Sequence, residues 1–161
     1  MNQFDNLCKL AALICKSSRA VILLKHGEGL IKRASFGDFN AVPIQRVTFS
    51  KVALESADEF FEVPDALQDK RFKDEPIVIG IPFIRFFAGV QIRDREGQVI
   101  GVISITDQKP GALNEEQKEA MLTLAEEVLI HLSLKDREQE LLEQRAHLDD
   151  LLSLSAISPE I

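Results

Sequence analysis

The sequence has no apolar run near the roughly 18 residues that a membrane-spanning helix needs. A secretory signal is also missing. The first ten residues, MNQFDNLCKL, are polar and acidic, whereas a signal peptide has a basic start and an apolar run. These two absences predict a cytoplasmic segment that does not insert into a membrane.

Positive charge is scarce as well, because 19 lysines and arginines face 26 aspartates and glutamates, for a formal net charge of -7. Nucleic-acid surfaces need clustered lysine and arginine to neutralise phosphates, so no nucleic-acid partner is expected. The length of 161 residues suits one domain, and 45% apolar residues are enough for a single core.

Cysteine and histidine are too few and too scattered for a metal or haem site. Cys8 and Cys15 are expected on one helix face, roughly 10 Å apart, which is too far for a disulfide. Both are therefore predicted to be small core residues. His26 lies in an expected turn, and His131 and His147 lie on a long helix, so neither haem nor a structural metal is expected.

Catalytic motifs are missing. The three histidines lie far apart, Ser50 has no evident base, and the chain has neither a nucleophile elbow nor a glycine-rich phosphate loop. The adjacent carboxylates of Glu115 and Glu116 belong to an expected helix start. We therefore expect no catalysis within this chain.

The residues that are present predict helices and an antiparallel sheet. Residues 4–18 carry apolar side chains at the three- and four-residue spacing of an amphipathic helix. Residues 19–37 hold two apolar runs around HGEG, which predicts a β-hairpin. Residues 49–56 predict a short helix and residues 59–63 a short strand.

A second hairpin is predicted from Arg85 to Asp107, with strands at about 85–93 and 98–107 and a turn at DREG. Both faces of these strands are largely apolar: Phe86 and Ala88 point one way and Phe87 the other. A sheet that is apolar on both sides must be covered on both sides.

The stretch from Pro64 to Phe83 shows no sustained helical or strand period. Loops of this length are usually functional or disordered. Its phenylalanines and isoleucines are too numerous for disorder. We therefore predict that it folds back and covers the face of the sheet that the helices leave open.

The C-terminal third predicts one long helix, capped by Asn114 with Gln117 three residues on, and without proline until Pro159. Leucines recur every seven residues in its second half, and the predicted parallel dimer seam comprises Leu134, Leu141, Leu148 and Leu152. Two further seam positions are charged, Glu138 and Arg145. A single amphipathic helix packed on its own domain therefore remains the alternative.

Three stretches, SFGDFN, VPDALQDKRF and IRFFAGVQIRDREGQVIGVISITDQKPGALNEEQKEAMLTLAEEV, resemble GAF domains of bacterial multidomain sensor proteins. The resemblance covers about residues 4–135. It implies an α+β fold with a six-stranded antiparallel sheet, helices on one face, covering loops on the other and a long C-terminal helix. The implied division is a sensory domain over residues 1–135, then a helical signalling linker and the start of a following region over 136–161.

The resemblance also implies a function. Such domains bind small molecules between sheet and covering loops and pass a change along the C-terminal helix to an output domain in the same polypeptide. Histidine kinases, GGDEF cyclases and phosphodiesterases are outputs of this family, and a homodimer is expected. The alternative is a dimerisation scaffold without a ligand, whose pocket Phe72 and Phe86 would fill.

Departures from the family limit the ligand. Ser104 and Ser50 stand where many relatives have cysteine, which disfavours thiol-based sensing. Relatives that attach a bilin use a cysteine next to a histidine, and this chain has no such pair, so covalent bilin is not expected. The ligand itself stays unknown.

The expected ligand-binding residues are mostly apolar, as in most small-molecule sites. The predicted walls are Phe72, Ile79, Ile84, Phe86 and Ala88. Asp65 and Arg71 are the candidate polar contacts. The structural alternative is that Asp65 and Asp69 cap short turns and that Arg71 pairs with one of them.

Overall fold

A five-stranded antiparallel sheet in the order β2-β1-β5-β4-β3 forms the centre of the fold. The computed structural model describes residues 2–37 and 48–157. The strands are β1 (Arg19–His26), β2 (Gly29–Phe36), β3 (Phe60–Val63), β4 (Phe86–Arg93) and β5 (Val99–Asp107). Both predicted hairpins are confirmed, whereas a sixth strand is not found within the described residues. The last three residues of the SFGDFN motif, and residues 158–161 of the predicted following region, lie outside them.

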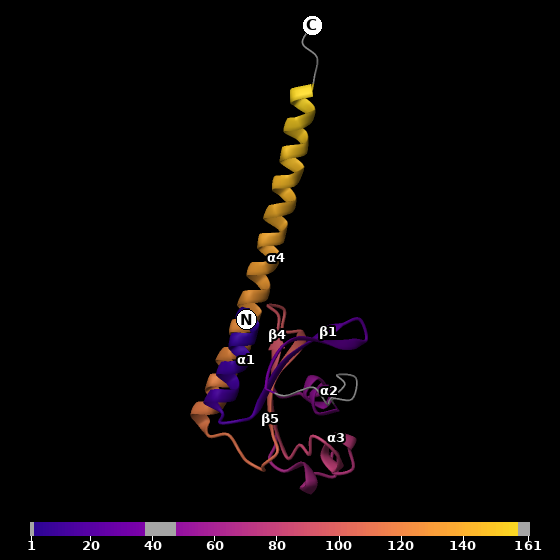
Figure 1. The fold of residues 1–161 in the computed structure, drawn as a ribbon, viewed down its shortest axis with the longest axis vertical. Coiled ribbons are helices and arrows are strands. Elements are labelled where there is room, and N and C mark those ends of the chain that lie inside the picture. Colours follow the sequence, from indigo (N-terminus) through magenta and orange to yellow (C-terminus); the bar gives the residue numbers. More distant parts are fainter. Residues whose placement is uncertain (1, 38–47, 158–161) are drawn as a thin grey trace. The chain divides into compact units, whose positions relative to one another are not determined.

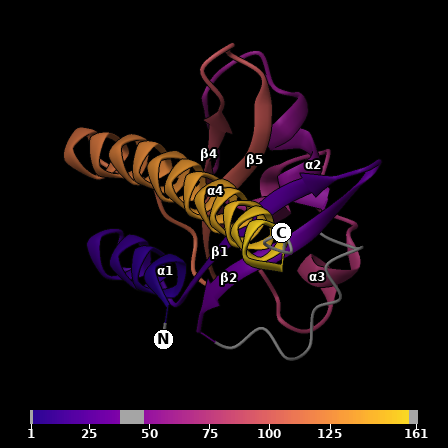
Figure 2. The same cartoon turned by 90° about the horizontal axis from the view of Figure 1, so that it is seen from above.

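Helices and short helical turns cover the two faces of the sheet. They are α1 (Gln3–Ile14), α2 (Thr48–Glu55), the 3-10 turn η2 (Ala66–Gln68), α3 (Pro76–Ile79) and α4 (Glu115–Ile157). Figure 1 shows α1 and the start of α4 on one side of the sheet and α2 and α3 on the other. The view from above in Figure 2 shows the same separation. No helix in the described part of the chain is long and apolar enough to cross a membrane.

The chain divides into two compact units, residues 1–129 and residues 130–161. The first unit contains the sheet, α1, α2 and the beginning of α4. The second contains the remainder of α4. The predicted cap of α4 is confirmed, because the side chains of Asn114 and Gln117 each accept a hydrogen bond from the other's backbone N–H, at 2.8 and 3.0 Å.

A capping box starts α1: the Asn2 side chain accepts from the Asp5 N–H, and the Asp5 carboxylate accepts from the Asn2 N–H. The buried face of the helix, which includes Cys8 and Ala11, packs on β1, β2 and β5. Cys8 and Cys15 are free and buried, which confirms the prediction of two core thiols.

Burial raises the pKa of the Cys8 thiol to about 12 and that of Cys15 to about 11, from an ordinary value of 9.0. Between pH 9 and about 11 the unfolded chain therefore releases thiol protons that the folded chain keeps. We expect the free energy of unfolding to fall as pH rises through this window. Urea unfolding at pH 8 and pH 10.5 measures the effect, and a Cys8→Ala/Cys15→Ala variant should lose part of it. An identical pH dependence in both proteins would contradict the prediction.

Helix α2 is attached to the sheet by the buried side chain of Gln91. Its amide nitrogen donates to the carbonyl oxygens of Ala53 and Ser56 at 2.7 and 2.8 Å. Its amide oxygen accepts two hydrogen bonds from the Arg93 guanidinium, at 3.0 and 2.7 Å. Since helix ends leave carbonyl groups without intrahelical partners, Gln91 both satisfies this end and sets the position of α2 over β4 and β5.

Candidate functional site

The candidate site lies between the sheet and the stretch from Pro64 to Arg85, called the covering loop here. Backbone bonds hold both of its ends: Ala66 N–H donates to the Arg85 carbonyl at 2.6 Å, and Gly111 N–H donates to the Pro64 carbonyl at 3.0 Å. The loop contains η2 and α3, which are too short to give a visible period in the sequence. The prediction that this apolar stretch folds back over the sheet is confirmed, because Phe72, Ile77 and Val78 are buried in the loop-side core.

Four aromatic rings, the phenylalanine cluster, fill much of this space. Phe49 of α2 stacks on Phe72 of the covering loop, with ring centroids 4.4 Å apart, and on Phe87 of β4 at 5.2 Å. Phe61 of β3 meets Phe72 and Phe87 edge-on at 6.4 and 6.1 Å. Stacked and edge-on pairs of this kind stabilise a core beyond their buried area. The cluster joins the covering loop, α2 and the sheet in one contact.

Gly89 makes room for one of these rings. A Cβ atom at Gly89 would lie 3.1 Å from two ring carbons of Phe87 and 3.1 Å from a methyl carbon of Val102. The Phe87 ring therefore lies along the sheet over Gly89 rather than pointing straight out. Gly89 pairs with Ser104 across β4 and β5, so this ring lies beside the position of the Ser104 side chain.

Three buried hydroxyl groups on the loop side have no hydrogen-bond partner within the described residues: Ser50, Ser104 and Thr106. Their side chains are 0%, 1% and 7% exposed. Ser104 and Thr106 alternate with Val102 of the loop-side core, so they share its face of β5. Ser50 belongs to α2, which packs on β4 and β5. Buried hydroxyls nearly always have partners, so these three are unusual in that the described residues supply none.

The structure separates the predicted wall residues. Phe72 and Ile84 are buried in the loop-side core, whereas Ile79 is 62% exposed at the end of α3. Phe86 and Ala88 lie on the other face of β4, because they alternate with Phe87 of the loop-side core. They therefore do not share a wall with Phe72. Alternation along the sequence shows that Phe86 and Phe87 point to opposite faces of β4, but it does not determine which of them faces the covering loop.

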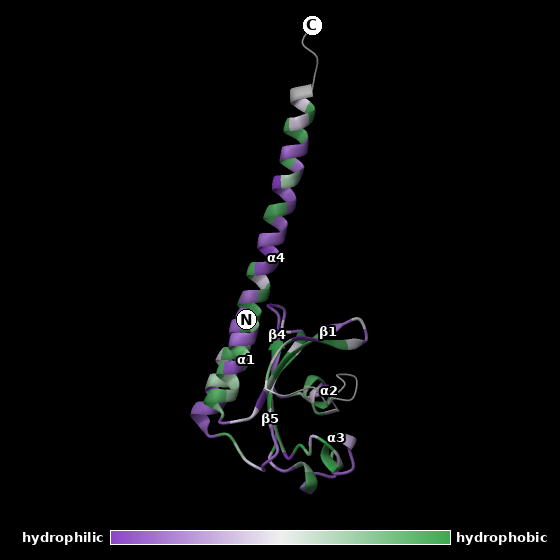
Figure 3. Cartoon of the chain, viewed as in Figure 1, coloured by the Kyte–Doolittle hydropathy of each residue, from purple (hydrophilic) through white to green (hydrophobic). Residues whose placement is uncertain are grey.

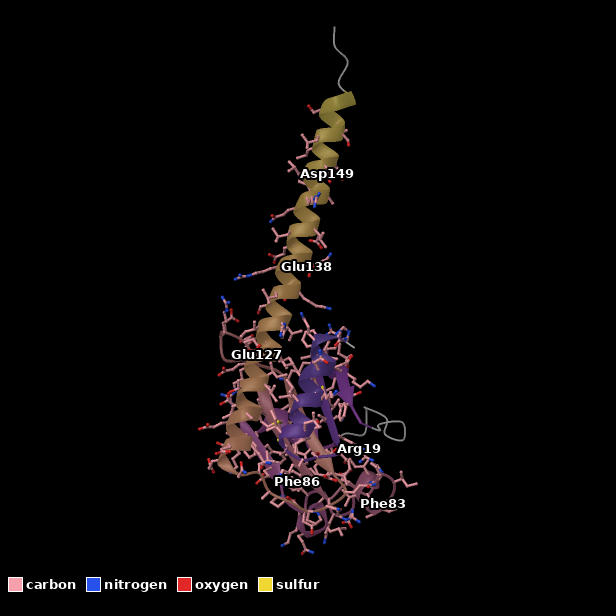
Figure 4. The ribbon with its side chains drawn as sticks, turned by 60° about the vertical axis from the view of Figure 1, so that its left-hand side comes forward. Arg19, Phe83, Phe86, Glu127, Glu138 and Asp149 are labelled. Carbon is pink, nitrogen blue, oxygen red and sulfur yellow. The ribbon has the colours of Figure 1, made fainter. Side chains whose placement is uncertain are left out.

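Contacts of neighbouring residues identify which face of β3 and β4 lies toward α1 and the start of α4. Ala88 pairs with Glu62, whose carboxylate accepts from the Leu113 N–H at 2.9 Å just before α4. A Cβ at Gly111 in the same connection would lie 3.9 Å from the Phe86 ring. In Figure 4, Phe86 lies toward α1 and the start of α4, and Phe83 lies away from them.

The predicted polar contacts have structural partners. Asp65 caps η2 by accepting from the Leu67 N–H at 3.1 Å. Arg71 forms a two-pronged pair with Asp69, at 3.0 and 2.8 Å, which lowers the pKa of the Asp69 carboxyl. The Arg71 guanidinium also lies 5.1 and 5.0 Å from the ring centroids of Phe61 and Phe72. It thus closes the outer side of the phenylalanine cluster.

Arg85 also stabilises the covering loop through hydrogen bonds. One terminal nitrogen of its guanidinium donates to the carbonyl oxygens of Val78 and Ile84, at 2.7 and 3.2 Å. The Gln108 amide donates to the Pro82 carbonyl at 2.8 Å. These bonds satisfy loop carbonyls that burial would otherwise leave unpaired. Within the described residues, no group of three or more histidine, cysteine, aspartate or glutamate side chains is arranged to hold a metal.

The residues of the predicted dimer seam lie in the second compact unit. Leu134, Leu141, Leu148 and Leu152 are 54%, 65%, 56% and 60% exposed. Figure 3 shows hydrophobic and hydrophilic residues mixed along this part of α4.

Comparison with known proteins identifies the fold and one relative. The sequence model of the GAF domain matches residues 2–132. A cyclic di-GMP phosphodiesterase of Pseudomonas aeruginosa is 40% identical over 120 residues, which are 74% of this chain and 20% of that protein. The chain thus spans about a fifth of that relative.

Solved structures agree on the fold. The GAF domain of an Acinetobacter phosphoenolpyruvate-protein phosphotransferase superposes with a TM-score of 0.68 at 17% identity, over 85% of this chain and 84% of that one. A domain of a putative two-component sensor histidine kinase from Sinorhizobium meliloti gives 0.62 at 17% identity, over 88% and 94%. At these identities the likeness concerns the fold alone.

Proposed function

Because this chain belongs to the GAF domain family, which is itself non-catalytic, we propose that it is the sensory, regulatory segment of a cytoplasmic multidomain signalling protein. A small molecule binds on the loop side of the sheet, and its binding biases a dimer helix formed by α4. An output domain in the same polypeptide, of the cyclic di-GMP phosphodiesterase or histidine kinase type, reads that change. In this proposal residues 1–135 are the sensory domain and residues 136–161 the linker.

The observation that carries the sensing proposal is the set of buried, unpartnered hydroxyls of Ser50, Ser104 and Thr106. A buried hydroxyl without a partner costs about 1–3 kcal/mol, and a ligand with matching polar atoms removes that cost. Phe72, Ile84 and Phe87 are the apolar walls beside them. Asp65 and Arg71 act on the ligand indirectly, by holding the covering loop closed.

The second candidate function is a dimerisation scaffold without a ligand, and a different observation supports it. Phe49, Phe72 and Phe87 stack closely on the loop side, which suits a scaffold whose interior its own side chains fill. Such a module would dimerise without binding a ligand. The two candidates differ in whether the protein carries an additional small mass.

Native mass spectrometry of the gently purified chain, recorded over a dilution series, separates these candidates. A dimer that carries one extra small mass per chain supports the sensory proposal and gives the mass of the ligand. A dimer without extra mass supports the scaffold. A monomer at every concentration contradicts self-association of this segment.

Replacing Ser104 with alanine tests the role of the hydroxyls. In the ligand-free protein the variant should be more stable by about 1 kcal/mol, because it removes an unpaired buried hydroxyl. In the sensory proposal it should also lose the extra mass, or bind it more weakly. Urea unfolding and native mass spectrometry measure the two effects. Loss of stability without any change in bound mass would mean that Ser104 has a structural role.

Replacing Leu141 with aspartate tests the dimer helix. A charge at an apolar seam position should raise the dimer dissociation constant by at least roughly tenfold, since each copy would bury it against the other. Leu142→Asp is the matched control. The Leu142 side chain is 55% exposed and that of Leu141 is 65% exposed, but Leu142 points about 100° away around the helix. Native mass spectrometry over a dilution series measures the fraction of dimer. An equal fraction of dimer for Leu141→Asp and wild type would exclude this seam.

A further inference from the structure

An open groove lies on the loop side of the sheet, at the end where β1 turns into β2 and β4 turns into β5. Two adjoining hollows of about 410 and 540 Å³ form it, and Lys25 and Leu54 line both of them. Lys25 alternates with Leu23 of the loop-side core, so its side chain lies on that face of β1. Leu54 of α2 and Leu30 of β2 pack against the same core. We call this surface the hairpin groove.

The hairpin groove and the covering loop lie at opposite ends of the sheet. Val99 and Ile100 line the groove at the start of β5. The covering loop instead meets the end of this strand, where the Arg85 N–H donates to the Asp107 carbonyl at 2.9 Å. Ser104 lies four residues beyond Ile100, about 13 Å at the rise of a strand. A small molecule in the groove therefore occupies a different site from one bound at Ser104.

The smaller hollow carries charges of both signs. Lys25 of β1 and Lys51 of α2 line it together with Glu28 of the hairpin turn and Glu55, the last residue of α2. All four side chains are exposed, and none of them forms an ion pair within the described residues. Even Lys51 and Glu55, which are four residues apart on α2, are not paired. The hollow therefore offers both kinds of charge to a molecule that also carries both.

The larger hollow is mostly apolar. Leu54, Val99 and Ile100 line it, and its polar residues are Lys25 and Gln98. The three apolar side chains are partly buried, so a portion of each faces the open groove. Most small-molecule sites combine an apolar wall with a few polar groups. The hairpin groove has this composition, with a charged part and an apolar part side by side.

The walls of the groove are held in place before any ligand binds. The Gln91 amide donates to two carbonyl oxygens at the end of α2, at 2.7 and 2.8 Å, and so fixes the helix that carries Leu54. On the other side the turn that carries Glu28 is only two residues long, because His26 pairs with Gly29. Groups held on helices and strands are positioned more precisely than groups on long loops.

We propose that the hairpin groove binds a free α-amino acid with an apolar side chain, at a site separate from the candidate site. Lys25 and Lys51 bind its carboxylate, and Glu28 and Glu55 bind its ammonium group. Both groups are bonded to one carbon atom, so they must bind within one hollow, and the smaller hollow has both kinds of partner. The apolar side chain of the ligand lies in the larger hollow against Leu54. Glu55 ends α2, where the helix dipole also favours a cation.

A ligand with charge of one sign fits the smaller hollow less well. An anion such as phosphate would face the carboxylates of Glu28 and Glu55, and a polyamine would face Lys25 and Lys51. Like charges brought together weaken binding, so they select against both kinds of ligand. An amino acid meets opposite charges with each of its groups. Because the four side chains are exposed, each ion pair contributes little, and we expect a dissociation constant of roughly 1 mM.

An NMR titration of the isotope-labelled full chain with L-leucine tests the groove. The backbone amide signals of Gly27, Gly29 and Leu54 should shift along one saturation curve, because these residues line the two hollows. Leucinamide lacks the carboxylate, N-acetylleucine lacks the ammonium group and glycine lacks the apolar side chain, so each should bind at least roughly tenfold more weakly. The proposal is overturned if no groove signal shifts saturably. It is also overturned if leucinamide or N-acetylleucine binds as well as leucine, because the groove would then bind a peptide end.

A pair of lysine variants tests the assigned contacts. Lys25→Gln/Lys51→Gln should weaken leucine binding at least roughly tenfold, and it should bind leucinamide as well as it binds leucine, because the partners of the carboxylate are gone. Lys70→Gln/Lys73→Gln is the matched control, since it removes two exposed lysines from the covering loop, and it should bind leucine as the wild type does. Circular dichroism verifies that both variants fold. Equal leucine affinity in the two variants would overturn the assignment.

Ser104→Ala separates this inference from the proposed sensory function. It should leave leucine binding in the hairpin groove unchanged, whatever it does to a ligand at the candidate site. If Ser104→Ala abolishes the leucine shifts and the lysine variant keeps them, leucine binds at the candidate site and the hairpin groove is overturned. If native mass spectra show no ligand at the candidate site but leucine still saturates the groove signals, the sensory proposal fails alone and the hairpin groove stands.

Discussion

Replacing Phe72 with alanine should lower the free energy of unfolding by about 3–5 kcal/mol. The side chain is fully buried and stacks on Phe49 with ring centroids 4.4 Å apart. It also contacts Phe61 edge-on and lies beneath the Arg71 guanidinium. Alanine removes the ring that joins the covering loop to α2 and β3, and it leaves a cavity beside the rings of Phe49 and Phe61. Urea unfolding measures the loss.

The control for Phe72→Ala is Phe83→Ala, in the same loop. Phe83 is 43% exposed, so its replacement should cost far less. The cavity also gives a second readout, because a dry cavity lined by phenyl rings binds small aromatic molecules such as benzene. Benzene should stabilise Phe72→Ala and leave the wild type unchanged. A loss below about 1 kcal/mol, similar to that of Phe83→Ala, would mean that the phenylalanine cluster does not hold the loop.

The order of elements follows from local patterns in the sequence. Apolar runs on either side of HGEG and DREG mark both hairpins, and Asn114 with Gln117 marks the start of α4, because caps and turns depend on residues close in the chain. The same locality explains why η2 and α3 are missed. They are three and four residues long, shorter than any window in which a period can be recognised.

The composition of the site depends on which face of β4 meets the loop. Phe86 and Phe87 are equally apolar neighbours that point to opposite faces, so the sequence separates them without assigning a side. The assignment comes from distant partners: Phe49 contacts Phe87, and Gly111 lies beside Phe86. Such contacts join residues that are 25 to 38 positions apart, and no local pattern reports them.

The importance of the three buried hydroxyl groups, in contrast, could not be predicted from the sequence. From the sequence, Ser104 stands out only as a position where related domains have cysteine, Ser50 as such a position and as a serine without a base, and Thr106 not at all. The alternation of Val102, Ser104 and Thr106 does place both hydroxyls on one face of β5. Whether a buried hydroxyl has a partner depends on the tertiary structure, so their importance emerges only once α2 and the covering loop are in place.

Replacing Gly101 with alanine should destabilise the fold by about 3 kcal/mol, through crowding rather than backbone conformation. A Cβ atom at this position would overlap the carbonyl oxygen of Leu23 and lie 2.8 Å from a methyl carbon of Leu24. Gly101 pairs with Leu24 of β1 and Ile92 of β4, so it sits in the middle of the sheet. The β1–β2 register shifts between Ile22 and Leu23, next to this close approach.

Gly29→Ala is the matched control for Gly101→Ala. Gly29 begins β2, and a Cβ there would meet nothing nearer than the His26 carbonyl oxygen at 3.9 Å. Thermal unfolding should show a fall of roughly 10 °C for Gly101→Ala and little change for Gly29→Ala. Because Gly101 lies on β5, the strand that carries Ser104 and Thr106, the variant should also weaken any ligand that binds these hydroxyls. Equal melting temperatures for the two variants would mean that β1 can move away from β5 at little cost, and that the centre of the sheet is not rigid enough to hold a fixed site.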